Sequence, residues 1–309
     1  MSAPSPSVSS PACSVAVVAL FGARPLERCL AALAQQEDVP ELEIVVAFDP
    51  LLPEIGALAP RHPGVRFVRG PSRAPTEITV AAVAATRGEI VLLTEDHCLP
   101  GPRWARALAD ALAAPDRAAA GGTVDTDSAA PASDYALYLV EFFRYAPPRP
   151  EGPSPSLTVC NVGYRRERLE AVADVWRERF HETAVHDALR ARFGALWLAP
   201  AAGVSMRRRV RLRDAAAERF AYGRLFGCVR RRALSPARRA AVALATLGLP
   251  LLLALRLVPR AFARPGRRAQ ALRALPAVAV LLLAWSAGEW AGLVTGRHRD
   301  VAAAPERAD

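Results

Sequence analysis

The segment from Gly88 to Pro100 constrains this chain more than any other, because an apolar run meets a charged cluster there. Five consecutive apolar or β-prone residues occupy positions 90–94, and Glu95, Asp96 and His97 follow directly. Such a run is typical of a strand buried on both faces of a parallel sheet. Ligands of parallel sheets bind at the carboxyl ends of the strands. Two carboxylates and an imidazole at that point predict a seat for a divalent cation.

Strand and helix patterns alternate over the first part of the chain. Strand-like runs occupy residues 14–21, 42–48, 65–68, 90–94 and 118–124, and helical patterns occupy 24–36, 51–58, 75–86 and 103–113. Gly88 is expected to act as the C-cap of the helix that precedes it. This alternation predicts an α/β fold with a mostly parallel sheet flanked by helices.

The second predicted strand also ends in a carboxylate, Asp49, which precedes Pro50. In nucleotide-binding α/β domains an acidic residue at this point contacts a ribose or a base, although aspartate before proline is also a common turn former. The sequence contains neither G-x-G-x-x-G nor G-x-x-x-x-G-K-[ST], so a Rossmann dehydrogenase or a P-loop enzyme is disfavoured. A metal held at Asp96 and His97 could neutralise a diphosphate instead.

The order of these segments resembles that of family 2 glycosyltransferases, which have the GT-A fold. The resemblance covers roughly residues 14–206 and rests on segments 14–21, 24–30, 43–49, 84–93, 95–97 at the position of the D-x-D motif, Pro100, Trp104, 160–166, and 181–190 with Gly194. Each segment alone is a weak signal, whereas their order and spacing together are fairly specific. The resemblance implies transfer of a sugar from a nucleotide-diphospho-sugar donor with the help of Mn²⁺ or Mg²⁺.

The same resemblance implies roles for individual residues. Donor binding falls to Asp49, Glu95 and Asp96, the metal to Asp96 and His97, the general base to Glu182, and the acceptor side to Trp104, Asn161 and Arg165. Two positions depart from the family pattern. His97 replaces the second aspartate of the D-x-D motif, and an imidazole suits Mn²⁺ better than Mg²⁺. Thr183 follows Glu182 where the family has a second carboxylate.

Sugar transfer with inversion requires a base near the acceptor hydroxyl and charge stabilisation at the leaving diphosphate. Glu182 and the strand end at Glu95 satisfy both needs, although Glu182 also fits an ordinary acid at a helix N-terminus and residues 95–97 fit a solvated loop. His181 and His186 are five residues apart and do not share a helix face, which excludes an H-E-x-x-H zinc motif. Glu182 and His186 do share a face and are expected to pair.

The chain has a net charge of +10, and its positive charge concentrates after Met206. Nucleic-acid binding is disfavoured, because these arginines adjoin apolar stretches and lack interleaved aromatic residues. The five cysteines are scattered and form no C-x-x-C pair, so a disulfide framework or a zinc site is not expected. The apolar run at 15–20 is too short for a signal-peptide core.

Two apolar stretches, residues 240–258 and 275–296, approach the roughly 20 residues that span a bilayer. They predict membrane attachment on the cytoplasmic face of the plasma (inner) membrane, and a lipid-linked or envelope glycan acceptor. The loop between them carries five arginines, which the positive-inside rule keeps in the cytoplasm: Arg260, Arg264, Arg267, Arg268 and Arg273. Spanning helices and helices that are re-entrant or lie in the interface therefore both stay open.

The predicted organisation has five parts. They are a disordered N-terminus (1–13), a GT-A domain (14–206), a basic juxtamembrane region (207–239), two membrane-associated helices (240–296) and a disordered tail (297–309). The Pro-rich segment 147–155 is expected to be an irregular loop. A non-catalytic, membrane-tethered nucleotide-binding protein remains as the alternative function, because both the D-x-D and the base motif are altered.

Overall fold

The computed structural model describes residues 12–39, 42–232 and 234–297. The predicted disordered ends lie outside these residues except at positions 12, 13 and 297. The chain divides into two compact units. The N-terminal unit contains residues up to Gly122 together with Pro150–Val204, and the C-terminal unit contains Thr123–Arg149 and the chain from Ser205 onward.

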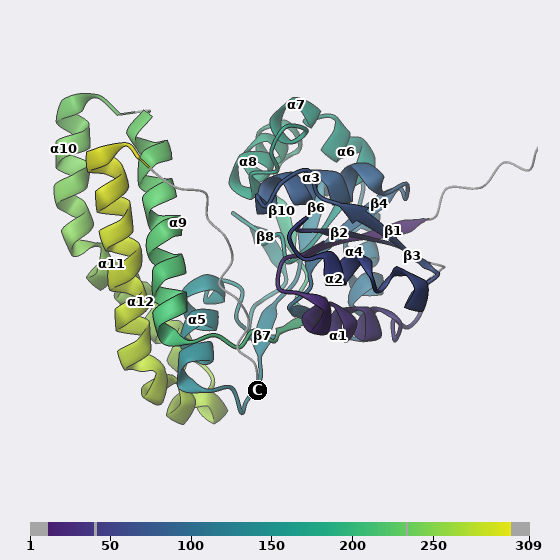
Figure 1. The fold of residues 1–309 in the computed structure, drawn as a ribbon, viewed down its shortest axis with the longest axis horizontal. Coiled ribbons are helices and arrows are strands. Elements are labelled where there is room, and N and C mark those ends of the chain that lie inside the picture. The colour runs from purple at the N-terminus through teal and green to yellow at the C-terminus, as the bar shows by residue number, and fades with distance from the viewer. Residues whose placement is uncertain (1–11, 40–41, 233, 298–309) are drawn as a thin grey trace, which may run out of the picture. The chain divides into compact units, whose positions relative to one another are not determined.

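A sheet forms the centre of the N-terminal unit (Figure 1). It has eight strands in the order β3-β2-β1-β4-β9-β6-β10-β8. The strands are β1 (Cys13–Ala19), β2 (Leu42–Phe48), β3 (Val65–Arg69), β4 (Ile90–Glu95), β6 (Ala119–Gly121), β8 (Gly152–Ser154), β9 (Asn161–Arg165) and β10 (Leu196–Leu198). β3, β2, β1 and β4 are parallel, whereas β9 runs antiparallel to both β4 and β6. The predicted α/β class is confirmed, with a sheet that is parallel in its first half and mixed in its second.

Helices cover the sheet of this unit on both faces. They are α1 (Ala23–Leu33), α2 (Pro53–Gly56), η1 (Ala59–Arg61), α3 (Pro75–Ala85), α4 (Trp104–Ala113), α6 (Arg166–Glu170), α7 (Ala173–Trp176) and α8 (Glu182–Phe193), with the short strand β5 at Cys98–Pro100. Val91 and Leu93 of β4 belong to one apolar core with side chains of α3 and α8. Leu92, on the alternate face, lies near Leu108 and Leu112 of α4. β4 is therefore buried on both faces, as its composition predicts.

Gly88 does not cap α3, so that prediction was wrong. The helix ends at Ala85, and Thr86 follows as its C-cap residue in an extended conformation. A Cβ atom at Gly88 would lie 2.7 Å from the backbone nitrogen of Ser14, and the Gly88 N–H donates to Ser14 Oγ over 2.6 Å. Glycine is needed here because the loop before β4 passes against the backbone of β1.

Two loop predictions also needed correction. The Pro-rich segment 147–155 contains β8, which pairs antiparallel with β10 at the edge of the sheet. An edge strand tolerates Pro153 because no strand beyond it needs the missing N–H. The strand expected at 118–124 is two strands, β6 and β7 (Val124–Thr126), separated at Gly122 and Thr123.

The C-terminal unit is helical, and α12 is its central helix. Its elements are α5 (Ala132–Phe142), α9 (Leu212–Arg232), α10 (Pro236–Ala245), η2 (Thr246–Gly248), α11 (Leu249–Phe262), η3 (Pro265–Arg267) and α12 (Arg268–Thr295), with β7 before them and β11 (Val204–Met206) at the start of the second segment. α12 packs against α5, α9, α10 and α11 (Figure 1). The segments Pro236–Phe262 and Pro265–Thr295 are long and apolar enough to cross a membrane, by length and composition alone.

Candidate active site

The site lies at the carboxyl end of β4, where Asp96 turns inward. Its side chain is completely buried, and Oδ2 accepts hydrogen bonds from the backbone N–H groups of Leu20 (2.8 Å) and Phe21 (2.7 Å). The Asp96 N–H donates to the carbonyl oxygen of Val18 over 3.1 Å. Asp96 therefore fastens the turn after β1 to the end of β4. This contact fixes the backbone from which Glu95 and His97 project.

Glu95 and His97 flank Asp96 in the chain. Glu95 Oε2 is 3.5 Å from His97 Nδ1, and Asp96 Oδ1 is 3.7 Å from the same nitrogen. The His97 ring packs edge-on against Phe21 and is almost fully buried, whereas 19% of the Glu95 side chain is exposed. Glu95 is thus the most accessible of the three side chains and the one best placed to meet a ligand.

These oxygen and nitrogen atoms could contribute to an open metal site. Within the described residues, no three His, Cys, Asp or Glu side chains are grouped so that together they could hold a metal ion. Asp96 Oδ1 is buried and accepts no hydrogen bond from any described residue, which leaves this oxygen available. Mg²⁺ in phosphate-transfer sites is held by one or two protein carboxylates and completed by substrate phosphates. The donor set at 95–97 fits a site of that kind.

Asp49 leaves the sheet at the same edge as Glu95. The parallel register of β1 pairs Ala19 with Phe48 on one side and Val18 with Glu95 on the other. Asp49 Oδ1 accepts from the N–H of Leu51 over 2.9 Å, which is the turn geometry that the sequence allows.

The second oxygen of Asp49 meets a residue that sequence reasoning missed. Asp49 Oδ2 is 3.2 Å from Nε of Arg73, whose side chain is half exposed. Arg73 is therefore a candidate for contact with a phosphate or a nucleotide. No local motif distinguishes it from the many other arginines of this chain.

Glu182 is the first residue of α8, and it is held by the segment that leads into β9. Its Oε2 accepts a 2.7 Å hydrogen bond from the N–H of Val159. Burial raises the pKa of Glu182 to about 7; the hydrogen bond from Val159 lowers it, and repulsion from Glu95 raises it further. Val159 lies two residues before Asn161, which pairs with Thr94 next to Glu95, so the structure brings the predicted base to the strand end that carries the predicted donor residues.

His186, one turn along α8, does not pair with Glu182, so this prediction was wrong. Its Nε2 lies 2.8 Å from the hydroxyl oxygen of Tyr164, and its ring is buried. Burial lowers the pKa of His186 to about 4, so the imidazole is neutral at physiological pH. His186 belongs to the core that supports α8 and has no charge to offer to Glu182.

Trp104 and Asn161 are brought together, but inside the protein. Trp104 Nε1 donates to Asn161 Oδ1 over 2.8 Å, and Asn161 Nδ2 donates to the carbonyl oxygen of Ala202 over 2.8 Å. Both side chains are completely buried. They fix the start of β9 and present no side-chain surface to an acceptor in this structure.

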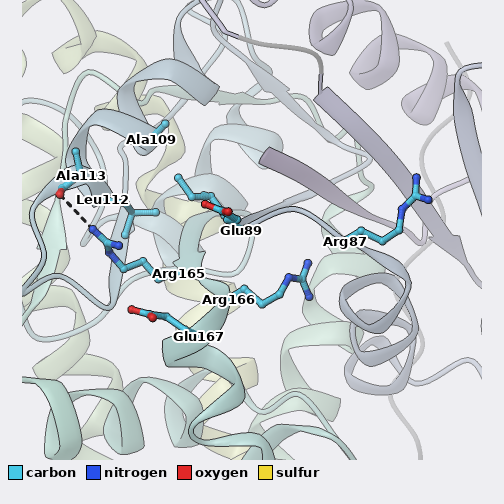
Figure 2. Close-up of a pocket in the computed structure, with 9 residues that line it drawn as sticks. Arg87, Glu89, Ala109, Leu112, Ala113, Arg165, Arg166 and Glu167 are labelled. Carbon is cyan, nitrogen blue, oxygen red and sulfur yellow. Dashed lines mark hydrogen bonds between the residues drawn. The ribbon is translucent and has the colours of Figure 1, made fainter. Parts of the chain in front are cut away.

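Arg165 lies at the other end of β4, beside its first residue and not beside its carboxyl end. Across the β4–β9 pair it is opposite Ile90, whereas Asn161 is opposite Thr94. Ile90 precedes Glu95 by five residues, or roughly 16 Å of extended chain. Arg165 donates to the carbonyl oxygen of Ala113 over 3.1 Å and lines a separate pocket with Arg87, Glu89, Arg166 and Glu167 (Figure 2). The structure does not bring it to the candidate site.

A family model described as "Glycosyl transferase family 2" matches residues 14–172. The chain therefore belongs to glycosyltransferase family 2 and is an enzyme that uses a nucleotide-sugar donor. Among solved structures it is similar to "Mannosyltransferase PcManGT from Pyrobaculum calidifontis in complex with GDP-Man and Mn2+". That match has 18% sequence identity and a TM-score of 0.53, and covers 94% of this chain and 86% of the other. The likeness supports the GT-A fold. No curated protein sequence matches the chain.

The fastening role of Asp96 predicts how two substitutions affect stability. Asp96→Ala leaves two N–H groups without their acceptor and should lower the free energy of unfolding by about 2–4 kcal/mol. Asp96→Asn keeps an acceptor oxygen and should cost less than half as much. Asp110→Ala removes a carboxylate that pairs with Arg106 on the surface and should change stability by less than about 1 kcal/mol. Urea unfolding measures all three; equal effects of Asp96→Ala and Asp110→Ala would contradict the role.

Proposed function

We propose that this enzyme transfers a sugar, with inversion, from a nucleotide-diphospho-sugar to a lipid-linked or envelope glycan acceptor. The supporting observation is that Val159, which donates a hydrogen bond to Glu182, lies two residues before Asn161, and Asn161 pairs with Thr94 next to Glu95 at the predicted donor-side strand end. In this proposal residues 14–206 form the catalytic domain, 207–239 a basic juxtamembrane region and 240–296 the membrane-attached helices.

Glu182 would act as the general base. The hydrogen bond from Val159 occupies Oε2 and fixes the carboxylate plane, so Oε1 is the oxygen that would take the proton of the acceptor hydroxyl. A pKa near 7 makes this carboxylate a stronger base than an ordinary glutamate, while a large fraction stays ionised at neutral pH. One carboxylate suffices for this step, which accommodates Thr183 at the position of the family's second acid.

Asp96 and His97 would hold a divalent cation, Glu95 would bind the ribose or complete the metal shell, and Asp49 would contact the nucleotide. The cation, Mn²⁺ or Mg²⁺, would offset the charge that develops on the leaving diphosphate. The imidazole of His97 favours Mn²⁺ of the two. The similar mannosyltransferase structure contains GDP-Man and Mn²⁺, which supports a guanine nucleotide donor as the first to test. Arg73, beside Asp49, would add positive charge on the nucleotide side.

The C-terminal unit would attach the enzyme to the cytoplasmic face of the plasma (inner) membrane. Support comes from the two apolar helices and from leucine side chains that remain exposed on them, Leu244, Leu247, Leu251 and Leu255 among others. Membrane attachment would place the site near lipid-linked acceptors, which diffuse only in the plane of the bilayer.

Substitution of Glu182 tests the proposed base. Glu182→Gln can still accept the Val159 hydrogen bond but cannot take a proton, so kcat should fall by roughly 10²–10⁴-fold. In the wild type, kcat/KM should rise with pH through about 7, because the base must be deprotonated. A cation bound beside Glu95 would offset the repulsion between Glu95 and Glu182 and shift the rise in kcat/KM to lower pH.

The folded-state pKa of Glu182 is raised, so its ionisation costs stability as pH rises from about 4.5 toward 7. Glu182→Gln should therefore be at least as stable as the wild type at pH 8. Glu178→Gln, an exposed position in the preceding loop, is the matched control and should leave turnover unchanged. Full turnover in Glu182→Gln would contradict the assignment. Donor binding without turnover in both the wild type and this variant would favour the non-catalytic alternative.

Substitution of His97 tests the metal. His97→Ala should weaken Mn²⁺-dependent binding of UDP- or GDP-sugars at least tenfold by isothermal titration, because the site loses its imidazole ligand. Circular dichroism should stay native. His62→Ala, at a histidine directly after η1, provides the control. If His97→Ala binds donor as tightly as the control with Mn²⁺ present, the cation is not held at residues 95–97.

A further inference from the structure

The turn between α11 and α12 is fastened to the segment that follows β6. Arg264 Nη1 contacts both carboxylate oxygens of Asp125, at 2.7 and 2.8 Å. Arg267 Nη2 donates to the carbonyl oxygen of Thr126 over 2.7 Å, and Gln270 Nε2 donates to that of Asp127 over 3.2 Å. All of these groups belong to the C-terminal unit. The tip of the apolar helix pair is thus held by a polar network.

The chain itself limits where this tip can lie. Asp125 is three residues after Gly122, where the first segment of the N-terminal unit ends. Three residues span at most roughly 11 Å, whereas the hydrocarbon core of a bilayer is about 30 Å thick. The Arg264–Asp125 contact therefore keeps the turn on the side of the membrane that holds the N-terminal unit, which carries the candidate active site and is called the catalytic unit below. A transmembrane hairpin with this turn on the far side is excluded while the contact persists.

α12 is also bound along its length to a charged helix. A Cβ atom on Gly223 of α9 would lie 2.2 Å from the carbonyl oxygen of Trp285, and one on Gly292 of α12 would lie 2.1 Å from that of Arg224. Gly227 and Gly288 make equally close approaches, so the two backbones touch at four small residues. Buried Glu289 of α12 forms an ion pair with Arg230 of α9. α12 cannot enter hydrocarbon without α9.

α9 is a poor membrane-spanning helix. It carries charged residues along its whole length: Arg213, Asp214, Glu218, Arg219, Arg224, Arg230, Arg231 and Arg232. Charged side chains at bilayer depth are costly, and α12, the apolar helix that packs on α9, cannot shield all of them. A span by α12 together with α9 is therefore disfavoured, as is the hairpin.

An interfacial position explains the surface that remains. Four leucines recur every three or four residues from α10 through η2 into α11, and each is about two-thirds exposed: Leu244, Leu247, Leu251 and Leu255. Exposed arginines flank this leucine stripe: Arg238 at its start, Arg256 and Arg260 at its end, and Arg268 and Arg273 on the adjacent start of α12. Leucines bordered by arginines fit the acyl boundary of a membrane with anionic headgroups.

We propose that the C-terminal unit lies in the interface of an anionic membrane, with the leucine stripe of α10–α11 inserted, and that neither apolar helix crosses the bilayer. This proposal rests on the proposed membrane attachment and specifies that the attached helices lie in the interface. Both ends of the helix pair, the turn at 263–267 and the catalytic unit then share one side of the membrane.

Cysteine labelling measures the sidedness directly. Gly266→Cys places a thiol in the turn, and Gly64→Cys places one on the catalytic unit; a Cβ at either position meets nothing within 4 Å. The five native cysteines are buried, so wild type gives the background. With a membrane-impermeant maleimide on sealed vesicles of known orientation, the two variants should react in the same preparation. Reaction of Gly266→Cys only where Gly64→Cys is protected would overturn the proposal.

Vesicle binding tests the inserted surface. Leu247→Glu with Leu251→Glu should weaken binding of the full chain to phosphatidylglycerol vesicles by roughly tenfold or more. Leu51→Glu, at an equally exposed leucine of the N-terminal unit, should have no effect. Unchanged vesicle binding by the double variant would overturn the proposal. If that variant loses only self-association, the leucine stripe is instead an interface with a second copy of the chain. If the wild type binds neither vesicles nor membranes, membrane attachment itself fails.

Discussion

The antiparallel pairing of β9 with β4 is the constraint on which the candidate site depends. Because Asn161 pairs with Thr94, β9 begins where β4 ends, and the segment before β9 reaches the carboxyl edge of the sheet. Val159 in that segment holds Glu182, so the first turn of α8 lies near Glu95. The donor side and the candidate base come together because one strand runs against its neighbours.

Local sequence patterns were enough to predict the parallel half of the sheet, the family and the carboxylates at the ends of β2 and β4. They could not predict strand direction. Arg165 follows Asn161 by only four residues, yet the direction of β9 carries it to the opposite edge. The sequence alone also does not distinguish a buried aspartate from a solvent-exposed one. Asp96 reveals its role only through Leu20 and Phe21, which are about 75 positions away in the chain.

Hydropathy predicted the two apolar helices correctly, but it records composition along the chain and not the partners of a helix. The pairing of α12 with the arginine-rich α9 depends on glycines that approach carbonyl oxygens of the other helix. The link between Arg264 and Asp125 joins residues 139 positions apart. Residues 123–149 group with the C-terminal helices for the same reason, which no linear pattern indicates. These contacts are the reason that we propose an interfacial position for this unit and not a transmembrane hairpin.

In the proposed mechanism one carboxylate, Glu182, removes the acceptor proton while Glu95 and its neighbours hold the donor diphosphate on the opposite side of the sugar. Such an arrangement allows one displacement at the anomeric carbon. The anomeric configuration of the product, read by NMR from the coupling between its C1 carbon and H1, tests this most directly. We expect a configuration opposite to that of the nucleotide-sugar donor. A product with the donor's configuration would require a second displacement and would contradict the proposed mechanism.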